Sequence, residues 1–186
     1  MSAARILGAP TGARHDHGHC VGHALAEAER ACRQQGLRLT PIRRQVLELI
    51  WRDHQPVKAY DLIDALRDRG IKTGPPTVYR ALDFLREAGL IHRLDTVNAF
   101  VGCGAHGRPH AGMFLICGSC GVVVELDAPD PLGLIGIEAD RLGFELVTQA
   151  VEILGRCSDC REEGTAAGAL SPVAREPDGA IDPGPA

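Results

Sequence analysis

The chain has few aromatic residues and no long hydrophobic run, and each shortage excludes a class of protein. Phe, Trp and Tyr make up 4% of its 186 residues. The longest apolar run, Met113 to Cys117, is far short of the ~20 residues that span a bilayer, so we expect no membrane partner. No apolar stretch follows the first arginine, which predicts no secretory signal and a cytoplasmic location. Hydrophobic residues still make up 45% of the chain, enough to predict a folded core.

Cysteine is frequent for a chain of this length. There are seven cysteines, an odd number that excludes complete intramolecular pairing, and in a reducing cytoplasm cysteines serve as metal ligands or reactive thiols. Four of them form two CxxC pairs, Cys117 with Cys120 and Cys157 with Cys160. One such pair can be a redox pair. Two pairs flanking one small unit are typical of a closed, structural zinc tetrahedron.

Charge is unevenly distributed along the chain, although the net charge is −4. Residues 30–94 contain thirteen Lys or Arg and seven Asp or Glu, whereas residues 162–186 contain five acids and one base. A basic segment in an acidic protein favours a local contact with nucleic acid, although most basic surfaces are simply solvated.

The order of the expected elements predicts an α+β fold with two domains. Apolar residues at helical spacing predict four helices. The first ends at Gly36, the second begins at Thr40–Pro41, the third ends at Gly70 and the fourth runs from Pro75 to Gly89. A hairpin of residues 90–95 and 99–102 follows. Strands at 113–116, 122–126 and 144–154 and a helix at 132–142 come next. We therefore predict a mobile His-rich arm at 1–19, a winged helix-turn-helix domain at 20–102 and a hinge at 103–110. An α/β dimerisation domain with structural zinc follows at 111–161, and a disordered acidic tail at 162–186.

In winged-helix folds the last helix before the wing enters the major groove of DNA. The outward face of this helix carries Thr77, Tyr79, Arg80 and Asp83. It lies in the basic segment, which favours DNA binding over a generic helical bundle.

A second set of possible metal ligands is spread along the chain: His92, Cys103, His110 and Glu125. These donors suit zinc, but spacing does not show that they converge. They could equally be a surface histidine, a buried thiol, a loop residue and a solvated strand residue. The N-terminal segment adds a cluster that is either a third metal site or an unstructured low-complexity segment: His15, His17, His19, Cys20 and His23.

The chain resembles the ferric uptake regulator family, and within it the zinc-sensing branch, in the segments LRLTPIRRQVLELI, AYDLIDALR, PPTVYRALDFLREAGLIHRLD, FVGC, PHAGMFLICGSCG and GRCSDC. The resemblance covers roughly residues 24–161. It implies a homodimeric repressor of zinc-uptake genes that binds a palindromic, A·T-rich double-stranded operator. It also implies two Zn²⁺ ions per chain, a structural ion on the four CxxC cysteines and a regulatory ion on His92, Cys103, His110 and Glu125. DNA contacts would fall on Tyr60 and Arg80, while Lys58 departs from the small capping residue that relatives often have.

Three alternatives compete with a zinc-responsive repressor. A family member could respond to iron or another divalent metal instead. A thiol redox sensor would need exposed cysteines with low pKa values. A zinc hydrolase would need an open metal position, and because all four candidate groups look like ligands we expect no enzyme.

Overall fold

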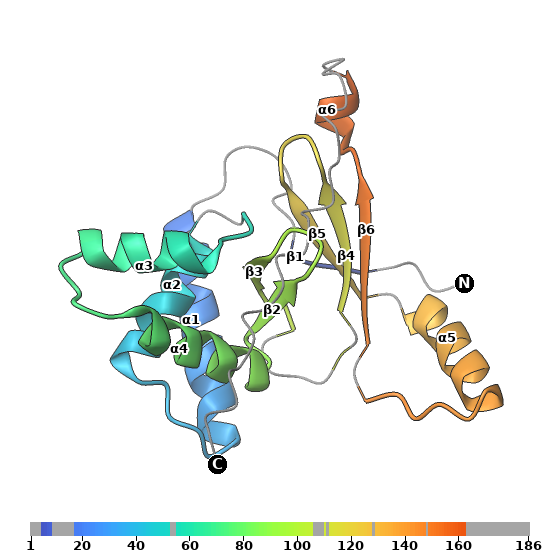
Figure 1. Ribbon diagram of the computed structural model, residues 1–186, viewed down its shortest axis with the longest axis horizontal. Coiled ribbons are helices and arrows are strands. Elements are labelled where there is room, and N and C mark those ends of the chain that lie inside the picture. The colour runs from blue at the N-terminus through green and yellow to red at the C-terminus, as the bar shows by residue number, and fades with distance from the viewer. Residues whose placement is uncertain are drawn as a thin grey trace, which may run out of the picture.

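The computed structural model describes residues 5–8, 17–52, 55–105, 110, 112–127, 129–147 and 149–162. Four helices precede a two-stranded hairpin, and two more helices and three strands follow, which form a four-stranded sheet with a strand from the N-terminal segment (Figure 1). The helices are α1 (His17–Gln34), α2 (Pro41–Trp51), α3 (Ala59–Asp68), α4 (Pro75–Glu87), α5 (Pro129–Arg141) and α6 (Ser158–Glu162). The strands are β1 (Arg5–Gly8), β2 (Ile91–Leu94), β3 (Ala99–Gly102), β4 (Gly112–Cys117), β5 (Val123–Asp127) and β6 (Ala150–Gly155).

Proline and glycine set the ends of the helices, as the sequence predicts. Helices α2 and α4 both begin with proline, where the missing N–H costs no hydrogen bond. Gly36, Gly70 and Gly89 follow helix ends with positive φ angles, a conformation that glycine adopts without strain. The apolar stripes of α1 to α4 pack into one core, with Leu47, Leu62 and Leu85 among its least exposed members.

Strands β2 and β3 form the predicted wing directly after α4. They pair antiparallel through a turn in which Asn98 has a φ of 47°, a left-handed conformation that asparagine tolerates. The order of helices followed by a wing, and then a separate sheet, confirms the predicted fold class, an N-terminal winged helix-turn-helix domain with a C-terminal α/β domain.

The C-terminal sheet has the strand order β1-β5-β4-β6, with β6 parallel to β4 and the other pairs antiparallel. One face of this sheet meets the wing. Leu94 and Val101 of the wing form a small buried cluster with Phe114, Ile116 and Val123 of the sheet. The two domains therefore share an apolar contact beside the hinge.

A close approach at Gly102 strengthens the base of the wing. A Cβ atom there would lie 2.2 Å from Cε2 of Trp51. The end of α2 can therefore pack against β3 only because residue 102 has no side chain.

The structure differs from the sequence predictions at three places. Residues 5–8 form β1 and α1 begins at His17, so these parts of the predicted arm have secondary structure that the sequence does not predict. Backbone pairing of β1 with β5 has no sequence periodicity to reveal it. The strand predicted at 144–154 is limited to Ala150–Gly155, and the short helix α6, which ends inside the predicted tail, was not foreseen. The rest of that tail, 163–186, lies outside the described residues.

Among the described residues, no helix combines the length and the apolar character needed to cross a membrane.

Candidate metal centres

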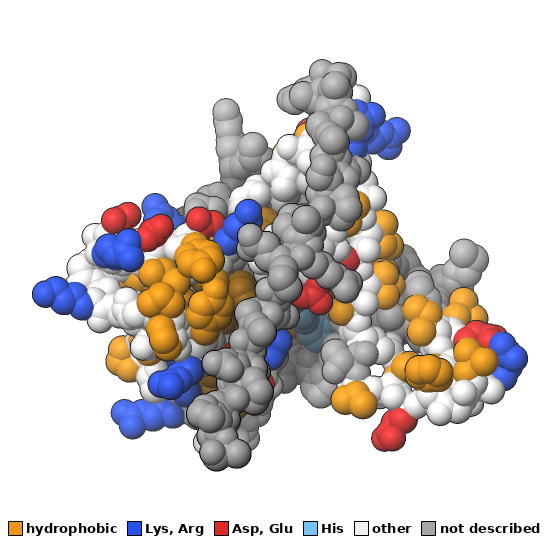
Figure 2. Space-filling view, viewed as in Figure 1, with side chains coloured by type: hydrophobic (Ala, Val, Ile, Leu, Met, Phe, Trp, Pro, Cys, Tyr) orange, Lys and Arg blue, Asp and Glu red, His pale blue; other side chains and the backbone are white. Residues whose placement is uncertain are grey.

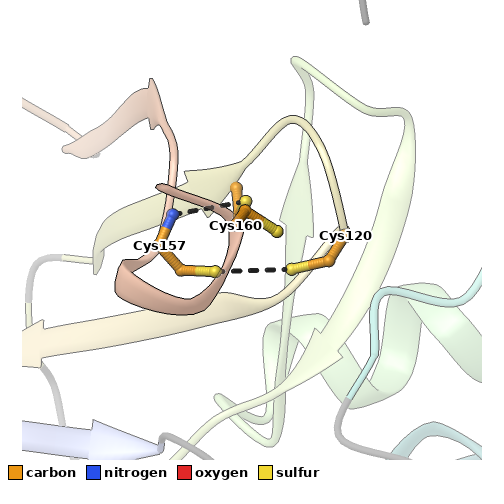
Figure 3. Close-up of side chains that lie close together, drawn as sticks. Cys120, Cys157 and Cys160 are labelled. Carbon is orange, nitrogen blue, oxygen red and sulfur yellow. Dashed lines mark hydrogen bonds between the residues drawn. The ribbon is translucent and has the colours of Figure 1, made fainter. Parts of the chain in front are cut away.

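The two CxxC pairs come together at the end of the sheet that carries α6. Cys117 ends β4 and Cys120 lies in the following turn, while Cys157 and Cys160 lie before and within α6. Their four sulfur atoms all lie within 4.8 Å of one another. Figure 3 shows Cys120 and Cys157 pointing toward each other, with their sulfur atoms 3.7 Å apart.

This geometry fits a zinc ion. A tetrahedron with Zn–S bonds of about 2.3 Å has edges of about 3.8 Å, close to this sulfur–sulfur distance. The backbone N–H of Cys157 donates to the sulfur of Cys117 at 3.4 Å. Although burial opposes ionisation, this bond and backbone bonding from Cys120 lower the pKa of Cys117 to about 6. The pKa of Cys160 is raised, chiefly by the neighbouring Cys157. Since close thiolates repel one another, a bound cation is what allows all four to ionise together.

The second candidate site lies between the two domains. His92 comes from β2 of the wing, Cys103 directly follows β3, His110 is the last residue of the predicted hinge and Glu125 belongs to β5. One donor atom from each residue lies within 4.8 Å of all the others. Sequence separation did not show this convergence, and the structure now does.

The donor atoms of this site are close enough to share one ion. His110 Nε2 lies 2.6 Å from Glu125 Oε1 and 3.7 Å from the sulfur of Cys103. The buried His92 Nε2 lies 3.0 Å from Glu125 Oε1, yet it makes no hydrogen bond of acceptable geometry. A buried nitrogen without a hydrogen bond costs free energy, so a metal bond to it would be favourable. The residues fit zinc.

The electrostatics of the site depend on Glu125, which is 3% exposed and is the only buried charged residue in the described part of the chain. Its Oε2 accepts the backbone N–H of Gly104 at 2.8 Å. Burial raises the pKa of Glu125, but His92 and this bond outweigh burial, and the net shift is downward. The carboxylate therefore stays ionised.

The nearby His92 and Cys103 shift in opposite directions. Burial lowers the pKa of His92, but Cys103 and Glu125 outweigh it and raise that pKa to about 9. Burial raises the pKa of Cys103, but the hydrogen bond with His110 and the nearby His92 lower it to about 7. Without metal, the site thus holds a protonated imidazole beside anionic partners. A bound cation would take the place of that proton.

The residues predicted to contact DNA lie on the surface of the helical domain. Tyr60 lies in the first turn of α3 and is 71% exposed. Thr77, Tyr79 and Arg80 are exposed on the first turns of α4. The neighbouring Asp83, also on the outward face, pairs with Arg86. Figure 2 shows Lys and Arg side chains spread over this half of the molecule.

The N-terminal cluster falls mostly outside the described residues. His15 lies outside the described residues, as do the side chains of His17, His19 and Cys20, so the proposed third site is described only at His23, on α1. Cys32 is buried in the core of the helical domain. Lys58 is the residue before α3 and makes no capping hydrogen bond.

Sequence reasoning missed two residues that support the hinge site. The ring of Phe114 lies 5.0 Å from that of His92, centroid to centroid, and packs against it edge-on. Gly104 supplies the N–H that orients Glu125. Phe114 lies within the apolar run that predicts a strand, but no signal marks a backbone donor such as Gly104.

The fold and the two clusters define a two-domain winged-helix protein with two candidate metal centres. The model of the ferric uptake regulator family matches residues 34–154. The chain therefore belongs to the ferric uptake regulator family.

Individual relatives belong to the zinc branch of this family. The chain is 40% identical over 139 residues to the zinc uptake regulation protein of Escherichia coli (strain K12), covering 74% of this chain and 81% of that one. It is similar to a solved zinc uptake regulator complexed with zinc and DNA, with a TM-score of 0.74, 38% identity and coverage of 78% and 98% of the two chains. Holo XcZur gives a TM-score of 0.71 at 45% identity, with coverage of 76% and 99%.

Proposed function

We propose that this protein is a zinc-responsive, DNA-binding transcriptional repressor of zinc-uptake genes, acting in the cytoplasm. The observation that carries the proposal is the convergence of His92, Cys103, His110 and Glu125 between the DNA-reading domain and the sheet domain. The similarity to zinc uptake regulators, one of them solved with zinc and DNA, supports the same function.

The ligands act as a tie between domains because they come from both sides of the hinge. Bound zinc would supply four bonds that hold a wing histidine and a sheet carboxylate at one point. His92 and Glu125 meet in the orientation of the wing on the sheet that the structure shows. Metal occupancy therefore selects that orientation in proportion to its differential affinity. Because α4 precedes the wing directly, the same selection sets the position of the reading helix.

DNA reading is assigned to Tyr60, Thr77, Tyr79 and Arg80. The planar guanidinium of Arg80 can donate two hydrogen bonds to N7 and O6 of a guanine. No carboxylate in the described part of the chain forms an ion pair with Arg80, since the nearby Asp83 pairs with Arg86. Its fork is therefore available to a base edge.

A homodimer on a palindromic, A·T-rich operator completes the proposal. The sheet domain exposes apolar side chains that its own chain does not cover, such as Leu134 and Ile137 of α5 and Val147 after it. Figure 2 shows hydrophobic atoms gathered over α5. A second copy that covers these side chains would hold two reading helices at a fixed separation, as two-fold operators require about 34–36 Å between half-sites.

The donor set favours zinc over the alternatives. Cys103 provides a soft thiolate, which suits zinc better than manganese, whose preferred ligands are carboxylates and water. All four positions of a tetrahedron at the hinge would be filled by protein, which leaves no place for a reacting water. The cavity beside Glu125 has a volume of about 30 Å³, room for about one water rather than for an organic substrate.

The test is a titration of operator binding with Zn²⁺, Fe²⁺ and Mn²⁺, with metal stoichiometry measured per chain. We expect zinc to promote operator binding at two ions per chain, and Cys103→Ser to retain one ion and to lose the zinc response. Cys32→Ser is the matched control, because its thiol is buried away from both centres. Unchanged zinc dependence in Cys103→Ser would refute the hinge mechanism, and a stronger response to iron would refute the zinc assignment.

A further inference from the structure

Three residues in a row across the sheet face the wing. Phe114 on β4 pairs in register with Glu125 on β5 on one side and with Glu152 on β6 on the other. Side chains of directly paired residues lie on the same face of a sheet. Glu125 and Phe114 already contact His92 of the wing. The third member of the row, Glu152, has no part in the metal site.

Glu152 holds the tip of the wing by hydrogen bonds to its backbone. Its Oε1 accepts the N–H of Asp95 at 2.7 Å and its Oε2 accepts the N–H of Thr96 at 2.9 Å. These two amides open the turn between β2 and β3. A carboxylate that accepts two neighbouring N–H groups forms charge-assisted bonds, which are stronger than neutral ones.

The two attachments lie at different points along the hairpin. His92 is attached within β2, and the turn at Asp95 and Thr96 is attached at the tip. Val97, in the same turn, packs against the apolar cluster that the wing shares with the sheet. One attachment point would let the hairpin pivot on the sheet, whereas two fix its direction.

We propose that Glu152 is a positioning residue that latches the wing onto the sheet without metal and thereby sets how much zinc the protein needs to bind DNA. The inference rests on the proposed function. The latch favours the same orientation as the hinge ligands, so its loss lowers the fraction of molecules in that orientation. By linkage, the apparent zinc affinity of the hinge site then falls by the same factor.

The test compares wild-type protein, Glu152→Ala and Glu152→Gln in zinc titrations of operator binding, with free zinc buffered. For Glu152→Ala we expect the midpoint to move about five- to thirtyfold to higher zinc, the range for two such bonds at a partly exposed position. The plateau at saturating zinc should stay at the wild-type value, because the metal then holds the orientation alone. Glu152→Gln keeps one acceptor oxygen, so its midpoint should move less.

Amide hydrogen exchange on the full chain tests the latch independently of DNA. We expect Asp95 and Thr96 to lose protection in Glu152→Ala and not in the control Glu138→Ala, whose carboxylate pairs with Arg141 of its own helix. Unchanged exchange at these amides, or an unmoved midpoint, would overturn the proposal, and a lowered plateau would assign Glu152 to the DNA contact instead. Wild-type protein without any zinc response, but with the protection pattern intact, would overturn the proposed function and leave the latch standing.

Discussion

The affinity of the hinge site for zinc should rise steeply with pH. Zinc binds deprotonated ligands, so every proton held by the metal-free site must leave when the ion enters. The pKa of His92 is about 9 and that of Cys103 is about 7. Near pH 7 the free site therefore holds one proton on His92 and half of one on Cys103, while the lowered pKa of Glu125 keeps that carboxylate ionised.

The size of the effect follows from these pKa values. Between pH 6 and pH 8 the His92 proton contributes a factor of about 100 to the apparent affinity, and the Cys103 proton a factor of about 10. Together these two groups predict an increase of about 1000-fold, with about 1.5 protons released from them per ion near pH 7. The sign is fixed because both groups are protonated below their pKa values in the free protein and unprotonated in the complex.

The assay is a competition titration against a chromophoric chelator of known pH dependence, on protein whose cysteine site is already loaded with zinc. Proton release into weak buffer gives an independent count. Cys32→Ser should follow the wild-type slope. A slope near zero between pH 6 and pH 8 would refute the reasoning, because it would mean that neither His92 nor Cys103 carries a proton that zinc displaces.

Three further predictions concern other parts of the molecule. Cys117→Ser should release the structural zinc and lower the free energy of unfolding by several kcal/mol, since structural zinc binding contributes folding free energy on the order of 10 kcal/mol. A mutant with an unchanged melting temperature would contradict this role. Arg80→Ala should lose about 1–3 kcal/mol of discrimination between operator and random DNA in anisotropy titrations, whereas an equal loss on both would indicate a phosphate contact. Gly102→Ala should destabilise the fold by about 1–3 kcal/mol in chemical denaturation, because its Cβ would overlap Trp51. Gly22→Ala, which meets nothing within 4 Å, should not, and equal effects of the two would contradict the packing argument.

Local signals in the sequence predicted the helical domain well. The prolines at Pro41 and Pro75 and the glycine at Gly70 act within a few residues of where they stand, so they mark helix ends without knowledge of the rest of the fold. The CxxC spacing predicts each pair of sulfur ligands for the same reason. The strand β1 has no such signal, because its backbone pairs with residues more than a hundred positions away.

The hinge site could not be predicted from residue types alone. His92, Cys103, His110 and Glu125 could be named from chemistry and resemblance, but their convergence depends on how the wing docks on the sheet. That docking relies on Phe114, on the Gly104 N–H and on Glu152, none of which has an unusual local sequence. Long-range contacts of this kind are set by the packing of two domains, and spacing along the chain does not report them.

The two metal centres differ in function because of which domains supply their ligands, more than because of the chemistry of those ligands. Cys117, Cys120, Cys157 and Cys160 all lie on the sheet domain, so metal there ties β4 to α6 and leaves the wing where it is. The hinge ligands instead combine a wing residue with a sheet residue, so their occupancy cannot change without changing the preference for one domain orientation. Loss of the first centre should therefore be measured as lost stability, and loss of the second as altered DNA binding in a protein that remains folded. A variant of either centre that showed the opposite pattern would mean that the orientation of the wing is not the quantity that zinc controls.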